Sequence, residues 1–315
     1  MSAIARSQRI KAEAFLADAE KTLKKTTWFA SSAEAKHEQA AELYEKAANA
    51  FKVGQFFMEA GQAYVKTAEI HRDKLNSLGE ASKSLSNAGS CFKRCSPSDA
   101  IETYRSAVTL LCDAGRLTQA AKLSKEIAEL YENEADTDST VLAIENYEQA
   151  SELFGMENSN SQQSQCLSKV AELCSAQLNP PDLLRAAQIY DDLGRQCLDS
   201  NLLKYNAKGY FLQSIFCHLA NGDSIAARQA HAKYGNLDFT FTESREGKLC
   251  AALVECMEQF DSEGFATACF EYDRISKLDP WKTTLLVKVK RSIEDQAGGE
   301  ALGGNAMDGD DVDLT

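Results

Sequence analysis

The stretch AIENYEQA, at residues 143–150, shows the pattern that decides the fold. It places Ala143, Tyr147 and Ala150 at steps of four and three residues. Steps of this size put the three side chains on one face of a helix. Small alanines let a neighbouring helix approach, and the tyrosine ring fills the groove beside them. The stretch therefore predicts a helix that packs closely against another helix.

The Ala-x-x-x-Tyr pattern recurs along the chain. Its copies are Ala40/Tyr44, Ala60/Tyr64, Ala100/Tyr104, Ala143/Tyr147 and Ala186/Tyr190. From the second copy onward, successive tyrosines lie 40, 43 and 43 residues apart. A further amphipathic segment lies between copies, so each repeat reads as two antiparallel helices. The spacing predicts an all-α array of helical hairpins that resembles a tetratricopeptide array, whose usual period is about 34 residues.

The repeat pattern stops at about residue 239, and the composition changes again near residue 295. We predict three parts: an array of hairpins over residues 1–238, a compact C-terminal helical bundle over 239–295 and a flexible acidic tail over 296–315. The tail contains no Lys or Arg, and its acidic residues are Glu300, Asp308, Asp310, Asp311 and Asp313. A compact terminal bundle would cap the exposed end of the array.

Charge and cysteine content exclude several functions. The chain has 47 acidic and 34 basic side chains, for a net charge of −13. Nucleic-acid binding needs the opposite balance, so no nucleic-acid partner is expected. The 10 cysteines include no C-x-x-C pair, so we expect no metal site, and a reducing, cytosolic compartment fits best. No run of about 18 apolar residues is present to cross a membrane.

No catalytic motif is present. The chain lacks a phosphate-binding loop and a nucleophile elbow, and its histidines are dispersed at His37, His71, His218 and His231. We expect no catalytic residue, no cofactor and no enzyme activity. Helical arrays usually bind other proteins along a concave face. From the residues alone, a scaffold for any helical or peptide partner remains open.

Several stretches resemble the soluble NSF attachment protein (alpha/beta-SNAP) family. The most specific are LLKYNAKGYF at residues 202–211 and YDRISKLDPWKTT at residues 272–284, and the ending GDDVDLT is similar to the family's acidic tail. The resemblance implies a right-handed array followed by a helical bundle. It also implies an adaptor: several copies would surround a SNARE complex of syntaxin-like proteins and recruit the hexameric AAA+ ATPase NSF, which pulls the complex apart. The alpha or beta form, the SNAREs involved and the number of copies stay open.

The resemblance also implies binding residues. For SNARE contact the matching basic positions are Lys93, Arg94, Arg116, Lys122, Lys169, Lys204, Lys208 and Arg245. For binding and stimulating NSF, the matching positions are acidic residues and one leucine: Asp223, Glu255, Glu258, Asp310, Asp311, Asp313 and Leu314. One family lysine is Gln165 here and one family acid is Gln259, so both surfaces are thinner. The alternative for each basic position is an ordinary solvated helix charge.

The family's membrane-contacting loop matches Trp28 and Phe29, which follow two lysines. These two rings either touch a membrane or pack onto the second hairpin, and the sequence leaves both open. The resemblance places the protein in the cytoplasm, attached peripherally to the cytosolic face of Golgi, vesicle and vacuolar membranes. Its expected process is vesicle-mediated protein transport, including ER–Golgi transport and membrane fusion.

Overall fold

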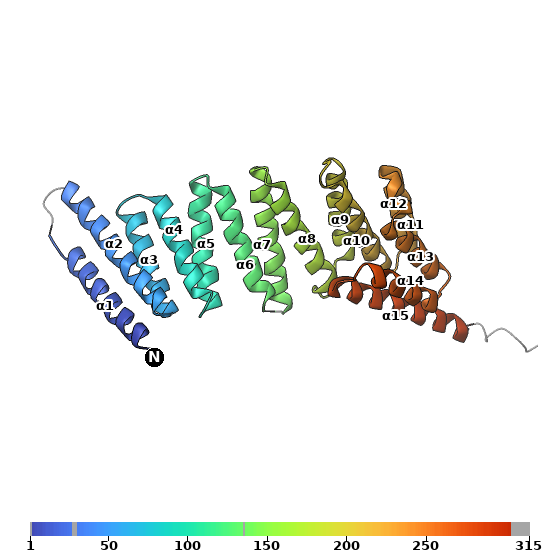
Figure 1. Ribbon diagram of the computed structural model, residues 1–315, viewed down its shortest axis with the longest axis horizontal. Coiled ribbons are helices and arrows are strands. Elements are labelled where there is room, and N and C mark those ends of the chain that lie inside the picture. Colours follow the sequence, from blue (N-terminus) through green and yellow to red (C-terminus); the bar gives the residue numbers. More distant parts are fainter. Residues whose placement is uncertain (1, 27–29, 135, 304–315) are drawn as a thin grey trace, which may run out of the picture. The chain divides into compact units, whose positions relative to one another are not determined.

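The computed structural model describes residues 2–26, 30–134 and 136–303 (Figure 1). Among these residues the regular elements are helices, with no β-strand. The chain divides into two compact units, one ending at Cys166 and the other beginning at Leu167. The helix α15 ends at Gly303, beyond residue 295, where the sequence places the start of the tail. The three predicted parts stay predictions.

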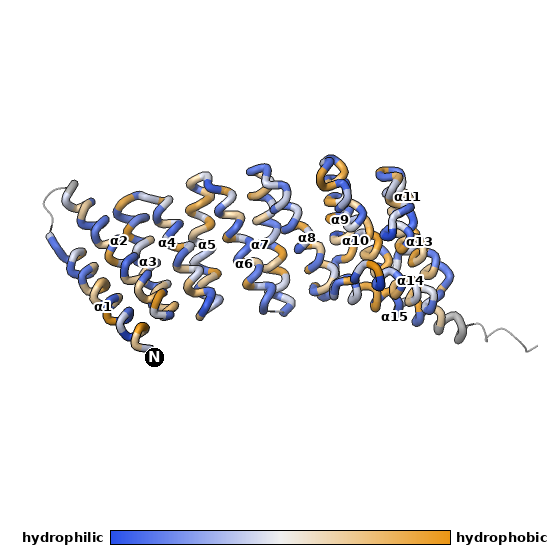
Figure 2. The backbone as a smooth tube through the Cα atoms, viewed as in Figure 1, coloured by the Kyte–Doolittle hydropathy of each residue, from blue (hydrophilic) through white to orange (hydrophobic). Residues whose placement is uncertain are grey.

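The first unit is a series of antiparallel neighbours. Each helix from α1 to α6 packs against the next one along the chain (Figure 1). In Figure 2, hydrophilic and hydrophobic positions alternate along these helices, as expected where one face is buried. The arrangement confirms the predicted all-α, tetratricopeptide-like array. The helices are α1 (Ala3–Leu23), α2 (Ala30–Val53), α3 (Phe57–Asp73), α4 (Leu78–Phe92), α5 (Pro97–Asp113), α6 (Leu117–Glu132) and α7 (Thr137–Met156).

The Ala-x-x-x-Tyr positions form the core, as predicted. All five alanines are fully buried, and all five tyrosines are buried. The phenol group of Tyr64 donates a hydrogen bond to Oδ1 of Asn49 at 2.7 Å, and that of Tyr147 donates to Oε2 of Glu132 at 2.7 Å. A buried hydroxyl must be hydrogen-bonded to avoid a desolvation cost. These bonds explain how the repeats tolerate tyrosine at a core position.

Glycine allows close helix approach at two inter-helix contacts of the first unit. A β-carbon added at Gly89 of α4 would overlap the ring of Tyr104 on α5. A β-carbon at Gly61 of α3 would likewise overlap the ring of Phe92 on α4. At both contacts the aromatic ring occupies the space that a side chain would fill. The pattern of small and aromatic residues therefore includes glycines as well as alanines.

The second unit contains α9 (Leu183–Leu198), the 3-10 helix η1 (Lys204–Asn206) and the helices α10 to α15. Its core includes the ring of Phe211, which stacks on Tyr234 with 4.0 Å between ring centroids. Trp281 of α15 donates from Nε1 to Oγ of Ser175 at 2.8 Å. Ser175 belongs to α8 (Asn160–Ala176), which spans the division between the units. The remaining helices are α10 (Ala207–Ala220), α11 (Ser224–Leu237), α12 (Phe239–Glu243), α13 (Arg245–Glu258), α14 (Ser262–Ile275) and α15 (Pro280–Gly303).

Most cysteines act as small core residues. Six of them are buried: Cys91, Cys166, Cys174, Cys197, Cys217 and Cys250. Burial raises the pKa of Cys166 to about 11 and that of the half-buried Cys269 to about 12. Thiols with such pKa values stay protonated at neutral pH and are poor nucleophiles. Packing therefore accounts for these residues.

Candidate functional site

Two predicted SNARE-binding residues, Lys208 and Arg245, line one hollow in the second unit. Lys208 lies in the first turn of α10, and Arg245 is the first residue of α13, which packs against α10. Neither side chain forms an ion pair with another described residue. Both sit at helix N-termini, where the helix dipoles add partial positive charge. Glu246 also lines the hollow, so two basic side chains face one carboxylate and the local charge is net positive.

Lys204 extends this positive site. It lies in η1, is exposed, and its Nζ atom is 5.4 Å from the ring centroid of Tyr205, which also lines the hollow. In Figure 1 the connection from α9 to α10 and the short helix α12 lie at the same end of this unit. We call Lys204, Lys208 and Arg245 the basic end. Sequence reasoning missed the lining residues Tyr205 and Tyr210, although both belong to the stretch LLKYNAKGYF.

The other predicted SNARE-binding residue of the second unit, Lys169, lies in α8 and is half-buried. Its Nζ atom is 3.3 Å from Oε2 of Glu172, one turn along the same helix. An intrahelical pair of this kind contributes only about 0.3–0.5 kcal/mol. Lys169 therefore remains a candidate, with a carboxylate beside it.

In the first unit, the predicted basic residues lie on α4 and α6 or at their ends. Lys93 forms an ion pair with Glu126 of α6, and Glu129 is 4.0 Å away. Arg116, at the start of α6, lies near Gly79 at the start of α4. Contacts at both ends show that α4 and α6 are neighbours that run in the same direction. Lys93 and Arg116 therefore mark the two ends of one α4–α6 surface.

The remaining two residues of the first unit differ in their surroundings. The guanidinium of Arg94 lies over the ring of Phe57, 4.4 Å from its centroid. Lys122 is exposed on α6 and has no ion-pair partner among the described residues. A free lysine can offer its full charge to a partner, whereas Lys93 must first separate from Glu126. Lys122 is therefore the stronger SNARE-binding candidate of these two lysines.

Three predicted NSF-binding residues gather at the opposite end of α13. Glu255 is exposed, and Glu258 forms an ion pair with Arg228 of α11 and lines one hollow with it. Farther along α11, a ring nitrogen of His231 is 3.0 Å from the carbonyl oxygen of Gly247. These two contacts make α11 and α13 antiparallel, so the start of α11 lies beside the end of α13.

Asp223 occupies the start of α11. Its carboxylate accepts a hydrogen bond from the backbone N–H of Ala226 at 2.7 Å, which caps the helix. The capping role is structural and uses one carboxylate oxygen, so the second oxygen remains able to meet a partner. We call Asp223, Glu255 and Glu258 the acidic end. The packing of α11 against α13 places these three residues at the same end of the helix pair, and their NSF-binding role stays a prediction.

The basic and acidic ends are separated by the length of a helix. Arg245 and Glu258 are the first and last residues of α13. At about 1.5 Å per residue, they are roughly 20 Å apart along its axis. The second unit therefore presents opposite charges at two well-separated places, which allows it to contact two partners at once.

Comparison with known proteins decides the family. The family model described as "Soluble NSF attachment protein, SNAP" matches residues 10–294. The chain belongs to the soluble NSF attachment protein family. The resemblance found in the sequence is therefore confirmed, and as a family member the chain is an adaptor protein and not an enzyme.

Individual relatives cover nearly the whole chain. The alpha-soluble NSF attachment protein of Mus musculus is 38% identical over 291 residues, which are 91% of this chain and 96% of the relative. The corresponding protein of Vitis vinifera is 39% identical over 259 residues, 82% of this chain and 87% of the relative. Vesicular-fusion protein SEC17 of Komagataella phaffii is 34% identical over 290 residues, 90% of this chain and 96% of the relative.

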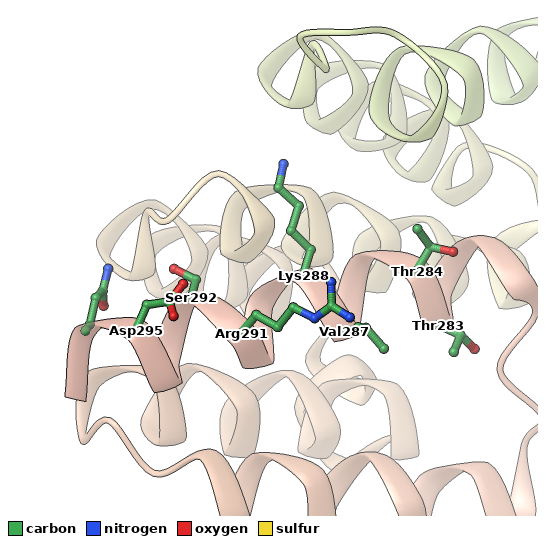
Figure 3. Close-up of a pocket in the computed structure, with 8 residues that line it drawn as sticks. Thr283, Thr284, Val287, Lys288, Arg291, Ser292 and Asp295 are labelled. Atoms are coloured by element: carbon green, nitrogen blue, oxygen red, sulfur yellow. The ribbon is translucent and has the colours of Figure 1, made fainter. Parts of the chain in front are cut away.

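A further open hollow of this SNAP family member lies on α15. Figure 3 shows its lining, which includes the basic residues Lys288 and Arg291 and the hydroxyl groups of Thr283 and Thr284. All the described lining residues come from α15, and none is a predicted SNARE-, NSF- or membrane-binding residue. No residue that lines this hollow belongs to the basic end or to the acidic end.

Several predicted residues of this SNAP family member lie outside the described part of the chain: Trp28, Phe29, Asp310, Asp311, Asp313 and Leu314. Their roles stay predictions. No helix within the described ranges is both long and apolar enough to cross a membrane. The described residues include no group of three or more His, Cys, Asp or Glu side chains arranged to hold a metal ion.

Proposed function

We propose that this chain joins assembled SNARE complexes to the ATPase NSF, which then takes the SNARE complex apart during vesicle trafficking and membrane fusion. The basic end of the second unit contacts the SNARE complex, together with Lys93, Arg94, Arg116, Lys122 and Lys169. The acidic end and the tail contact NSF, which is a hexamer. The observation that carries the proposal is the separation of opposite charges by the full length of α13.

The SNARE side of this mechanism depends on local charge. The chain as a whole carries a net charge of −13, which would repel an acidic partner at long range. Lys208 and Arg245 line one hollow together with a single carboxylate, that of Glu246, so the local charge is net positive. Such a patch fixes the orientation of an acidic SNARE surface and speeds its association.

The NSF side depends on several weak contacts. An exposed ion pair contributes about 0–1 kcal/mol and is screened by salt. Asp223, Glu255 and Glu258 must therefore act together with the tail carboxylates, and NSF recruitment should weaken as salt concentration rises. Several copies of the adaptor on one SNARE complex would add their contacts and raise the overall affinity for the hexamer.

A direct experiment tests this function. The full chain is incubated with an immobilised, fully assembled SNARE complex or with the separate SNARE peptides, and NSF is then added with ATP. We expect the chain to bind only the assembled complex, to retain NSF and to raise its ATPase rate. Equal binding to separate peptides, or no retention of NSF, would support a scaffold for a different partner.

Leu314 is proposed to trigger NSF rather than to anchor it. It is an apolar residue in an acidic tail, so it suits a small apolar pocket of a partner. The variant Leu314→Ala should bind NSF within about twofold of the unchanged chain and lose most of the ATPase stimulation. An ATPase assay beside a binding assay measures both quantities. Full stimulation by this variant would contradict the proposed role.

Trp28 and Phe29 are proposed to place the adaptor peripherally on the cytosolic face of Golgi, vesicle and vacuolar membranes. Burying two such rings contributes at most about 3–6 kcal/mol, which gives only weak membrane binding by itself. Contact would matter once a membrane-anchored SNARE complex already holds the chain. The double variant Trp28→Ser/Phe29→Ser should slow SNARE disassembly about tenfold on liposomes and leave disassembly of soluble SNARE complexes unchanged. Equal slowing in both settings would indicate a packing role.

A further inference from the structure

The turn between α13 and α14 has an unusual residue at its tightest position. Phe260 has a φ of 55°, in the left-handed region, and the backbone N–H of Asp261 donates to the carbonyl oxygen of Cys256 at 2.8 Å. This bond closes the end of α13 in a Schellman-type motif. Glycine is usual at this position, because a side chain with a β-carbon is strained there.

The same turn occurs at four other helix ends, with different residues. The equivalent left-handed positions are Gln55, Gly115, Asn158 and Gly222, and each has the matching hydrogen bond from the next N–H. At these four helix ends, the left-handed position is thus occupied by glycine or by a residue with an amide side chain. Phe260 is the aromatic exception. Backbone strain kept by a bulky residue points to a functional reason for that side chain.

The position of Phe260 supplies that reason. It is 37% exposed and follows Glu258 by two residues, so it lies at the acidic end. Asp261, the next residue, caps α14 through a 2.8 Å hydrogen bond from the N–H of Gly264. On the first turn of α11, at the same end, Ile225 is 68% exposed. A partly exposed aromatic ring and an exposed aliphatic side chain therefore lie at the end of the α11–α13 pair that carries the acidic end, where Arg228 is paired with Glu258.

This combination has a specific recognition chemistry. Carboxylates attract Lys and Arg side chains, and the face of an aromatic ring binds the same cations when they lie over it. Interfaces usually depend on a few aromatic or Arg anchors surrounded by weaker polar contacts. The acidic end alone offers only such weak contacts, and Gln259 stands where the family has a further acid. A ring at Phe260 would replace part of that lost attraction.

We infer that Phe260 is the anchor of the acidic end and receives a Lys or Arg side chain from the surface of the ATPase. Ile225, on the first turn of α11, adds an exposed apolar side chain at the same end. This inference rests on the proposed NSF-binding function and adds a residue that the sequence prediction did not include. It also explains why a strained backbone position holds an aromatic residue.

The variant Phe260→Gln tests the inference. Gln55 occupies the same turn motif, so glutamine fits the backbone at this position. We expect Phe260→Gln to weaken the retention of NSF by about tenfold on the SNARE-bound full chain, measured with a non-hydrolysable ATP analogue. Phe260→Tyr, which keeps an aromatic face, should retain NSF within about twofold.

A matched control is Phe270→Gln on α14. Phe270 is 65% exposed, so the same chemical change removes a more exposed ring away from the acidic end. This control should leave NSF retention unchanged, with both variants folded by circular dichroism. Equal retention by Phe260→Gln and the unchanged chain, or equal loss in both glutamine variants, overturns the inference. If the unchanged chain itself retains no NSF, the proposed function fails and the inference with it.

Discussion

Reversing two charges at the basic end, with Lys208→Glu and Arg245→Glu, should lower the affinity for an assembled SNARE complex by about 100-fold or more. Both side chains line one hollow with a single carboxylate, that of Glu246, and neither forms an ion pair with a described residue. The double change turns an attractive site into one that repels an acidic partner, and like charges facing each other at an interface cost several kcal/mol. A loss of about 100-fold corresponds to about 2.7 kcal/mol. Titration of the immobilised SNARE complex at physiological salt measures it.

The control for this experiment changes the net charge by the same amount elsewhere. Lys11→Glu with Lys46→Glu alters two exposed lysines on α1 and α2. We expect this control to reduce SNARE affinity by less than about fivefold, because neither lysine belongs to the predicted SNARE-binding residues and a single exposed charge contributes little. If both double variants lose affinity equally, net charge rather than the hollow controls binding.

The second large effect concerns stability. Gly89→Ala should lower the free energy of unfolding by about 1–3 kcal/mol, because the new β-carbon would overlap the ring of the buried Tyr104. The tyrosine would have to leave its position, and its hydroxyl contact with Ser90 at 3.3 Å would change with it. Helix propensity alone predicts the opposite, since alanine is favoured over glycine in helices. Denaturant unfolding of the full chain measures the change.

Gly79→Ala provides the matched comparison on the same helix. A β-carbon there would meet only the guanidinium of Arg116 at 3.7 Å, an ordinary contact distance. This variant should be neutral or more stable by up to about 1 kcal/mol. Equal stability of the two alanine variants would show that α4 and α5 do not approach as closely as the structure indicates.

The fold could be predicted from the sequence because its signal is local and repeated. Ala100 and Tyr104 are one helical turn apart, so their shared face follows from helix geometry alone. The requirement for glycine at position 89 could not be predicted in this way. It arises from the ring of Tyr104, which belongs to the next helix and leaves no room for a side chain. The sequence predicted the helix pair but could not identify which glycine its contact requires.

The sequence supplied candidate site residues one by one but not their arrangement in space. Lys208 and Arg245 are 37 positions apart, and only the packing of α10 against α13 places them in one hollow. The ion pair of Lys93 with Glu126 was missed for the same reason. Phe260 was missed because a positive φ at an aromatic residue has no sequence signature. In the sequence, its neighbours Glu258 and Asp261 indicate only that this surface is acidic.

The central claim is that two ends of one helix bind two different partners. A crossed comparison tests it most directly: Lys208→Glu/Arg245→Glu at one end of α13 and Glu255→Lys/Glu258→Lys at the other, each measured against the assembled SNARE complex and against NSF. The NSF measurement uses chain fixed to beads, so that it does not depend on SNARE binding. We predict that the first variant loses only the SNARE complex and the second loses only NSF. Loss of the same partner by both variants, or of neither, would contradict the account.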